Sequence, residues 1–271
     1  MEISDALQRK LDDLYDYLFK LESVLVCYSG GANSSLLLYA AKKVLGDKAE
    51  AIFFVSSIIP HSLEQEAVET AKLMNARLTV MPFPSLKSHE YYGNPENRCH
   101  LCKNGFLTKS ENFAARFGLK AIIEGSAGEA PGIHCQNKIA LTSMSVKSPF
   151  DELRITKSGI REISRALALS TWNKSPFFCL LTNFKHGEVI DEKMLLTVEM
   201  AEKFLQYHGF KYYIVWHDGK TAKLKLGAQE TVAAIGKMRQ KITSYFKSIG
   251  FESVYVVDYR LPKDMSEIKI Y

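Results

Sequence analysis

The sequence predicts an α/β fold, a doubly wound parallel sheet followed by a smaller C-terminal α+β domain. Apolar runs of strand length alternate with amphipathic stretches of helical spacing over the first two thirds of the chain. This alternation is typical of a parallel sheet covered by helices on both faces. A Gly-rich turn separates the first apolar run from a helix, and beyond residue 190 the order changes to helix, hairpin, helix and strand.

The elements of the first domain can be assigned from periodicity and turn residues. Leu7, Leu11, Leu14 and Leu18 recur near helical spacing and predict an amphipathic helix over 3–21. The run that follows it is continuously apolar, which is typical of a buried parallel strand. In order, the sequence then predicts strand 24–28, helix 36–44, strand 50–55, helix 62–75, strand 77–81, helix 104–117, strand 121–125, strand 144–146 and helix 156–167.

A composition change near Lys174-Ser175-Pro176 indicates the end of this domain. Asp218-Gly219 lies between two strand-like runs and predicts a hairpin. The expected elements are helix 193–208, strand 212–216, strand 222–226, helix 230–248 and strand 253–257. We therefore expect a first domain over residues 1–185 and a small α+β domain over 186–271, as the length of the chain also suggests.

Composition narrows the class of protein. The chain has 271 residues, of which 46% are hydrophobic and 24% are charged, as in a folded globular protein. No apolar run approaches the roughly 20 residues that span a bilayer, and residues 1–20 lack a signal-peptide pattern. We therefore expect a cytoplasmic protein without membrane contact. The net charge of +5 fits an anionic nucleotide ligand but does not require nucleic acid.

The turn Ser29-Gly30-Gly31 predicts an anion site. Glycine lets the backbone approach an oxyanion, and the first N–H groups of the following helix point at it. The hydroxyl groups of Ser29, Ser34 and Ser35 add donors. The loop matches neither the Walker pattern nor the dinucleotide fingerprint. A tight strand–helix turn with a Ser/Asn cap is the alternative interpretation.

Five cysteines, an odd number, argue against a disulfide framework and favour thiols that bind metal or react. Cys99 and Cys102 form a Cys-x-x-Cys pair, and Cys179 follows a Ser-Pro-Phe-Phe segment. These three thiols could hold three irons of a 4Fe-4S cluster and leave the fourth iron open. Cys27 is expected to be a small core residue, and Cys135 a bystander.

Charged residues near these cysteines have two interpretations. Arg98, Lys103 and Lys174 lie beside the cysteines in the sequence and could stabilise thiolates, or they could be solvated surface charges. Glu124 ends the fourth predicted strand, where such sheets place ligand-binding groups.

The loop resembles the Ser-Gly-Gly-x-Asp-Ser loop of the PP-loop ATP pyrophosphatases, which have the fold of the adenine nucleotide alpha hydrolases. The order of several motifs narrows the resemblance to the LarE family, which consists of ATP-dependent sulfur transferases of nickel-pincer nucleotide biosynthesis. These motifs are Ser-Gly-Gly-x-x-Ser, Asn-Arg-Cys-x-x-Cys-Lys before a helix, Glu-Gly-Ser, Trp-Asn-Lys-Ser-Pro-Phe-Phe-Cys and Trp-His-Asp-Gly-Lys-Thr-Ala. The two cysteines of the second motif make the chain similar to the three-cysteine members.

The resemblance implies an enzyme that adenylylates a carboxylate or carbonyl and then inserts sulfur from a cysteine or from a cluster-bound sulfide. It implies ATP, Mg²⁺ and a 4Fe-4S cluster as cofactors, a small nucleotide-like substrate, and a homo-oligomer. The implied nucleotide-binding residues are Ser29, Gly30, Gly31, Asn33, Ser34 and Ser35. The implied catalytic residues are Cys179, Cys99, Cys102 and Glu124, and the three cysteines are also the implied cluster ligands.

The chain departs from the family pattern at the expected site. Asn33 stands in place of Asp, paired aspartates are missing after Glu124-Gly125-Ser126, and no Ser-Arg follows Cys179. Either the substrate differs or ATP cleavage has been lost. The alternative functions are tRNA thiolation by a PP-loop enzyme and a non-catalytic nucleotide- or cluster-binding relative.

Overall fold

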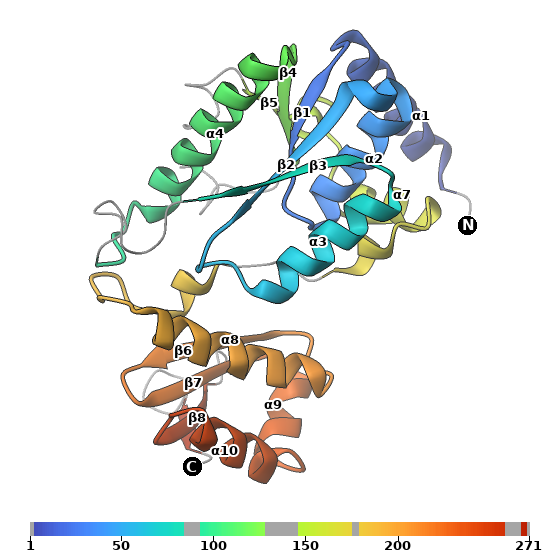
Figure 1. The fold of residues 1–271 in the computed structure, drawn as a ribbon. Helices are drawn as coiled ribbons and strands as arrows, with labels where there is room; N and C mark the ends of the chain where they lie inside the picture. Colours follow the sequence, from blue (N-terminus) through green and yellow to red (C-terminus); the bar gives the residue numbers. More distant parts are fainter. Residues whose placement is uncertain (1–2, 84–92, 128–145, 175–178, 258–266, 270–271) are drawn as a thin grey trace. The chain divides into compact units, whose positions relative to one another are not determined.

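The computed structural model describes residues 3–83, 93–127, 146–174, 179–257 and 267–269 (Figure 1). The chain divides into two compact units. The first unit comprises Met1–Ser56, His61–Phe83 and Asn97–Phe177, and the second comprises Ser57–Pro60, Pro84–Glu96 and Phe178–Tyr271. The assignment of domains to residues 1–185 and 186–271 stays a prediction.

The first unit is built on a five-stranded parallel sheet with the order β3-β2-β1-β4-β5. This arrangement confirms the predicted doubly wound α/β fold. Its strands are β1 (Val24–Cys27), β2 (Ala49–Val55), β3 (Arg77–Pro82), β4 (Ala121–Glu124) and β5 (Val146–Lys147). The predicted start of the last strand, Met144, lies outside the described residues.

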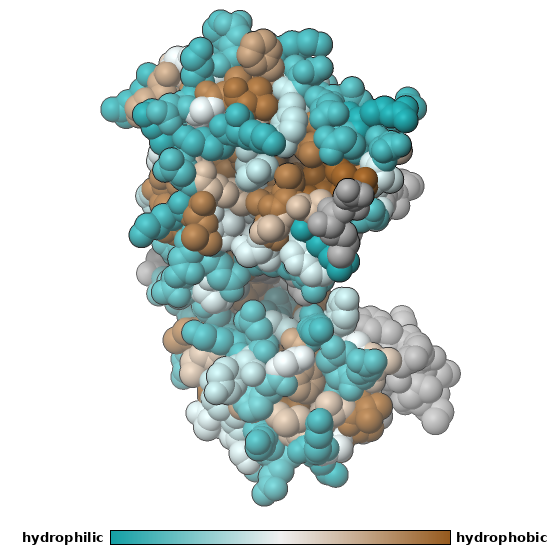
Figure 2. Space-filling model, turned by 90° about the vertical axis from the view of Figure 1, so that its right-hand side faces the viewer, coloured by the Kyte–Doolittle hydropathy of each residue, from teal (hydrophilic) through white to brown (hydrophobic). Residues whose placement is uncertain are grey.

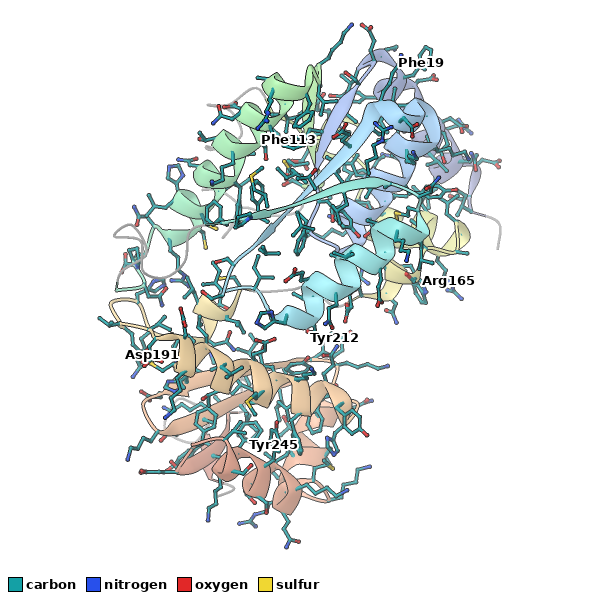
Figure 3. All side chains as sticks on the ribbon, in the orientation of Figure 1. Phe19, Phe113, Arg165, Asp191, Tyr212 and Tyr245 are labelled. Carbon is teal, nitrogen blue, oxygen red and sulfur yellow. The ribbon has the colours of Figure 1, made fainter. Side chains whose placement is uncertain are left out.

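Helices cover both faces of this sheet, so its central strands are mostly apolar. On one side lie α2 (Ala32–Leu45) and α3 (His61–Leu73), and α1 (Asp5–Lys20) and α7 (Lys157–Ala166) pack against α2 (Figure 1). On the other lies α4 (Arg98–Phe117), where Phe113 is buried on the side facing the sheet (Figures 1 and 3). The shorter helical elements are η1 (Gly46–Lys48), α6 (Pro149–Glu152) and η2 (Ser170–Asn173).

The strand order reverses between β1 and β4. From β1 the chain proceeds to β2 and β3, and then crosses back through α4 to β4 on the other side of β1. Ligands of such sheets bind in the crevice beyond the carboxyl ends of the strands at this switch point. Cys27 and Glu124 are register partners at that end of the two strands.

The second unit contains a four-stranded sheet with the order β6-β7-β8-β9. Its strands are β6 (Tyr213–Asp218), β7 (Thr221–Leu226), β8 (Ser253–Val257) and β9 (Glu267–Lys269). The first and last pairs are antiparallel and the middle pair is parallel. Its helical elements are η3 (Leu180–Asn183), α8 (Glu192–Tyr207), α9 (Ala228–Ile235) and α10 (Arg239–Ser248). The predicted hairpin is present, with Asp218 paired to Thr221 across Gly219-Lys220.

Two helix predictions were wrong. The helix expected from residue 104 begins six residues earlier, at Arg98, because no glycine or proline interrupts residues 98–103. The single helix expected over 230–248 is two helices, which separate at Gly236. Gly236 has φ −98° and ψ −117°, and a Cβ there would lie 2.9 Å from the carbonyl oxygen of Val232. Propensity alone does not report such a break.

The surface is mostly hydrophilic, with apolar side chains between the polar ones (Figure 2). Leu73 and Tyr207 are the most exposed large apolar side chains of the described residues. Scattered exposure of this kind is normal for a folded protein. None of the helices in the described ranges has the length and apolar character needed to cross a membrane.

Gly30 offers a test of how closely α3 packs against the turn that follows β1. Its φ is +71°, and a Cβ there would lie 2.7 Å from Cβ of Ala67 in α3. We expect Gly30→Ala to lower the free energy of unfolding of the first unit by about 2–3 kcal/mol, since overpacking adds to backbone strain. Urea unfolding followed by the fluorescence of Trp172, in a Trp216→Phe background, measures this change.

Gly118→Ala is the matched control, because Gly118 has φ +66° but nothing lies within 4 Å of its Cβ position. It should cost only the strain of the left-handed conformation, about 1 kcal/mol. Equal losses in both variants would show that Ala67 does not restrict the turn.

Candidate functional site

The Gly-rich loop joins the end of β1 to the start of α2. Gly30 takes the left-handed conformation, and Gly31, with φ −81° and ψ 169°, is the N-cap residue of α2. Gly31 has no side chain that could cap this end of the helix. The first N–H groups of α2 are therefore presented at the carboxyl end of β1, which is the requirement for binding an anion there. The helix begins at Ala32, four residues before the predicted start at residue 36.

Two of the predicted serines meet across the loop. The backbone N–H of Ser29 donates to Oγ of Ser34 at 3.2 Å, and the two hydroxyl oxygens lie 3.0 Å apart. Ser34 also donates to the carbonyl oxygen of Gly31 at 3.3 Å. Ser35 is completely buried in the interior of the first unit. Ser29 and Ser34 therefore line the loop, whereas Ser35 belongs to the interior.

Asn33 connects the loop to the neighbouring strand. Its Nδ2 donates to the carbonyl oxygen of Gly125, the residue after β4, at 2.9 Å. Gly125 is confined in turn, because a Cβ there would lie 3.0 Å from the backbone nitrogen of Ser34. An aspartate could not donate this hydrogen bond at neutral pH. Asn33, which stands where the family pattern has Asp, thus links the loop after β1 to the residue that follows β4.

Glu124 is buried at the end of β4, and both of its carboxylate oxygens are engaged. Oε1 accepts a hydrogen bond from Ser148 at 2.6 Å, and Oε2 accepts one from Ser126 at 2.7 Å. The ammonium of Lys103, from α4, lies 3.6 Å from Oε2. This pairing offsets the cost of burying the carboxylate. The sequence placed Lys103 with the cysteines, but the structure shows it also in contact with Glu124.

Cys27 lies beside this cluster, in β1. Its Sγ is 3.8 Å from Oγ of Ser110, and its side chain packs against Leu107. Burial raises the pKa of Cys27 to about 12, and the nearby charge of Glu124 acts in the same direction. The thiol is therefore neutral at physiological pH and serves as a core residue, as the sequence predicted.

Lys174 lies at the loop, although its sequence position had suggested a place beside Cys179. Its Nζ lies 3.2 Å from the carbonyl oxygen of Gly30 and 2.6 Å from Oε2 of Glu66 in α3. Sequence reasoning missed both Glu66 and this role of Lys174. The only available signal was a lysine shortly before a proline, which does not indicate a loop contact.

The cysteines belong to different units. Cys99 and Cys102 lie in the first turns of α4, three residues apart and hence on one side of the helix. His100, between them, contacts Asn104 through Nε2 at 3.0 Å. Cys179 precedes η3 in the second unit, and its carbonyl oxygen accepts from the backbone N–H and the hydroxyl of Thr182. Cys135 and residues 175–178 lie outside the described residues.

Within the described part of the chain, no three His, Cys, Asp or Glu side chains gather closely enough to hold a metal ion. The cluster of Cys99, Cys102 and Cys179 therefore stays a prediction.

The fold and this loop define the chain as a doubly wound α/β protein of the PP-loop type. No family model matches its sequence. It is 30% identical over 252 residues to an uncharacterised protein of Synechocystis sp., covering 90% of this chain and 92% of that one. It is 23% identical over 250 residues to the pyridinium-3,5-bisthiocarboxylic acid mononucleotide synthase of Lactiplantibacillus plantarum, covering 92% of this chain and 90% of the synthase. The chain is thus a distant relative of a LarE-type synthase.

The hydrogen bond of Asn33 generates a prediction for Asn33→Asp. The carboxylate would face the carbonyl oxygen of Gly125 and lose the donor, so we expect a loss of about 1–3 kcal/mol in the free energy of unfolding at pH 7. Repulsion raises the pKa of the new carboxyl in the folded state. The loss should therefore be small at low pH, where the protonated acid can donate, and should grow as the pH rises through that raised pKa.

Urea unfolding at several pH values measures the difference from the wild-type chain. Asn33→Ala is the control, because it removes the hydrogen bond without adding a charge and should show a loss that does not vary with pH. A pH-independent loss in Asn33→Asp would contradict the assigned contact.

Proposed function

We propose that this chain is an ATP-dependent sulfur transferase that activates a carboxylate or carbonyl of a small nucleotide-like substrate and replaces an oxygen with sulfur. The observation that carries the proposal is the uncapped start of α2 behind Ser29, Gly30 and Gly31, at the switch point of the sheet. The relationship to a synthase named for a bisthiocarboxylic acid mononucleotide supports the chemistry.

The loop suits the phosphates of ATP. Gly31 and the first residues of α2 offer backbone N–H donors, and the hydroxyl groups of Ser29 and Ser34 lie next to them. The positive end of the helix macrodipole favours the negative charge of a phosphate at the same place. We assign the nucleotide-binding role to these residues, whereas Ser35 supports the loop from the interior.

The side chains at the switch point fit Mg²⁺ only when the triphosphate of ATP supplies most of its ligands. The amide nitrogen of Asn33 is bonded to Gly125, and both oxygens of Glu124 already have partners. Mg²⁺ keeps several waters and often takes phosphate oxygens as ligands. In this proposal it arrives with ATP, and its chemistry is to neutralise charge on the departing pyrophosphate. Glu124 acts by holding Lys103, Ser126 and Ser148 at the edge of the site.

Activation and sulfur insertion follow in two displacements. An oxygen of the substrate carboxylate attacks the α-phosphorus of ATP, and pyrophosphate leaves into the N–H groups of the loop. The acyl adenylate carries AMP, a better leaving group than the original oxygen. The Cys179 thiolate attacks the acyl carbon and AMP departs. Loss of the Cα proton with cleavage of the Cβ–Sγ bond then gives a thiocarboxylate and leaves dehydroalanine at position 179.

Cys99 and Cys102 support a second source of sulfur. Their positions on one side of α4 allow each thiolate to bind one iron of a 4Fe-4S cluster, with Cys179 as the third ligand. The chemistry of the cluster would be to supply a sulfide in place of the Cys179 sulfur. Cys179 therefore takes part in both versions, as the sulfur donor in the first and as a cluster ligand in the second.

Gly31→Val tests the nucleotide site. The backbone of Gly31 is extended and accepts valine, but the branched side chain would cover the N–H groups of the loop. We expect the variant to fold with an unchanged melting temperature and to show no ATP binding by calorimetry. Gly31→Ala, whose Cβ would lie 3.5 Å from Oγ of Ser29, is the matched control and should retain binding. Unchanged ATP affinity in Gly31→Val would remove the phosphate-loop assignment.

Cys179→Ala tests the sulfur source. Iron and acid-labile sulfide per chain are measured after anaerobic purification, and the mass of the chain is measured after turnover with ATP and a pyridinium carboxylate mononucleotide. A sacrificial cysteine predicts an iron-free wild-type chain that becomes lighter by the mass of hydrogen sulfide. A cluster predicts iron that is lost in Cys179→Ala, with Cys27→Ala as the control that retains it. ATP binding without pyrophosphate release or either sulfur signature would contradict the proposed activity.

A further inference from the structure

Gly30 is held from two directions in the first unit. Ala67 of α3 lies where its Cβ would be, and the ammonium of Lys174 lies 3.2 Å from its carbonyl oxygen. The preceding residue of α3, Glu66, pairs with the same ammonium at 2.6 Å. Helix α3 thus packs against Gly30 through Ala67 and holds the ammonium of Lys174 through Glu66.

The backbone that carries Lys174 is itself fixed. Arg161, from α7, donates to the carbonyl oxygens of Trp172 and Lys174 at 3.1 and 2.9 Å. Arg165, one turn further along α7, lies with its guanidinium carbon 5.1 Å from the ring centre of Trp172. Two arginines of α7 therefore hold η2 and the residue after it, so the Lys174 side chain starts from a defined position.

The contact between Lys174 and the carbonyl oxygen of Gly30 determines the orientation of the Gly30–Gly31 peptide group. In a trans peptide the C=O of one residue and the N–H of the next point in opposite directions, and the described residues contain no cis peptide. An ammonium that binds the carbonyl oxygen of Gly30 consequently fixes the direction of the Gly31 N–H. That N–H belongs to the N-cap residue of α2.

We propose that Lys174 is a positioning residue, which orients the Gly30–Gly31 peptide so that the Gly31 N–H faces the phosphate. This inference rests on the loop being the phosphate site of the proposed function. The side chain of Lys174 is 19% exposed and that of Glu66 is 42% exposed, so the pair is partly shielded from solvent. Glu66 holds the ammonium at the carbonyl and neutralises its charge. The lysine acts on the nucleotide through Gly30 rather than through direct contact with phosphate.

The first test needs no nucleotide. The chain is labelled with ¹⁵N-glycine, and the Gly31 signal, identified by its disappearance in Gly31→Ala, is compared between wild type and Lys174→Met. The ¹⁵N shift of a residue responds to hydrogen bonding at the preceding carbonyl, so the Gly31 signal should move or broaden more than the other glycine signals. Lys120→Met, which breaks an exposed ion pair with Glu22, should leave it unchanged. An unchanged Gly31 signal in Lys174→Met would overturn the proposal.

The second test separates positioning from folding and from direct phosphate contact. Lys174→Met should weaken ATP binding about tenfold, the equivalent of one charge-assisted hydrogen bond, and should leave adenosine binding and the melting temperature unchanged. Lys174→Arg should restore most of the affinity and the Gly31 signal, and Glu66→Gln should fall between them. Parallel losses for ATP and adenosine would show a merely structural role. Weaker ATP binding with an undisturbed Gly31 signal would show direct phosphate contact.

The two proposals fail in distinguishable ways. If the wild-type chain binds no ATP, the proposed function fails, while the Gly31 signal still decides whether Lys174 orients the loop. In the other case, the wild-type chain binds ATP and Gly31→Val abolishes binding, but Lys174→Met changes neither the Gly31 signal nor the affinity for ATP. The assignment of the phosphate loop is then supported, and the positioning role of Lys174 is wrong.

Discussion

The left-handed turn at Gly30 is the constraint on which the rest of the site depends. It redirects the chain from a buried strand into α2, and only glycine fits, because Ala67 occupies the space of a side chain. The turn leaves the first N–H groups of α2 uncapped at the switch point of the sheet. Three further elements converge on this loop: α3 through Ala67 and Glu66, the segment after η2 through Lys174, and the end of β4 through Gly125. In the proposed function this loop is the anion site, and contacts that hold it in place before the ligand arrives reduce the ordering cost of binding.

Asn33 shows how a departure from a family pattern can have a structural meaning. A carboxylate at this position would add negative charge beside a phosphate site and could contribute to holding a cation. The amide instead donates to Gly125 and ties the loop to β4. The negative charge of Glu124 lies nearby, but Lys103 and two serines engage it. In the function proposed above, the cation that accompanies ATP is held chiefly by the nucleotide, and the loop serves as a cradle for the phosphates.

The family relationship and the local geometry support different parts of the functional argument. The geometry describes where an anion can bind and which groups surround it, and it applies to many chemistries. The relationship to the synthase points to sulfur and to a mononucleotide. The cysteines connect the two arguments, since Cys99 and Cys102 share one side of α4 in the first unit and Cys179 begins η3 in the second. The chemistry proposed here requires the sulfur to reach an adenylate formed at the loop.

The sequence by itself determined the fold class, the Gly-rich loop and most helix and strand positions of both units. Periodicity and turn residues are local properties, and a run such as Val24 to Cys27 reports its burial without reference to the rest of the chain. Hydrophobic periodicity did not determine the break at Gly236 or the early start of α4 at Arg98, because it reports which face of a helix is apolar and not where the backbone leaves helical geometry. Only the tertiary structure decided that Ser35 turns inward, that Asn33 reaches Gly125, and that Lys174 binds the loop. These contacts join residues 92 and 144 positions apart, and no spacing rule relates side chains that meet through the crossing of different strands and helices.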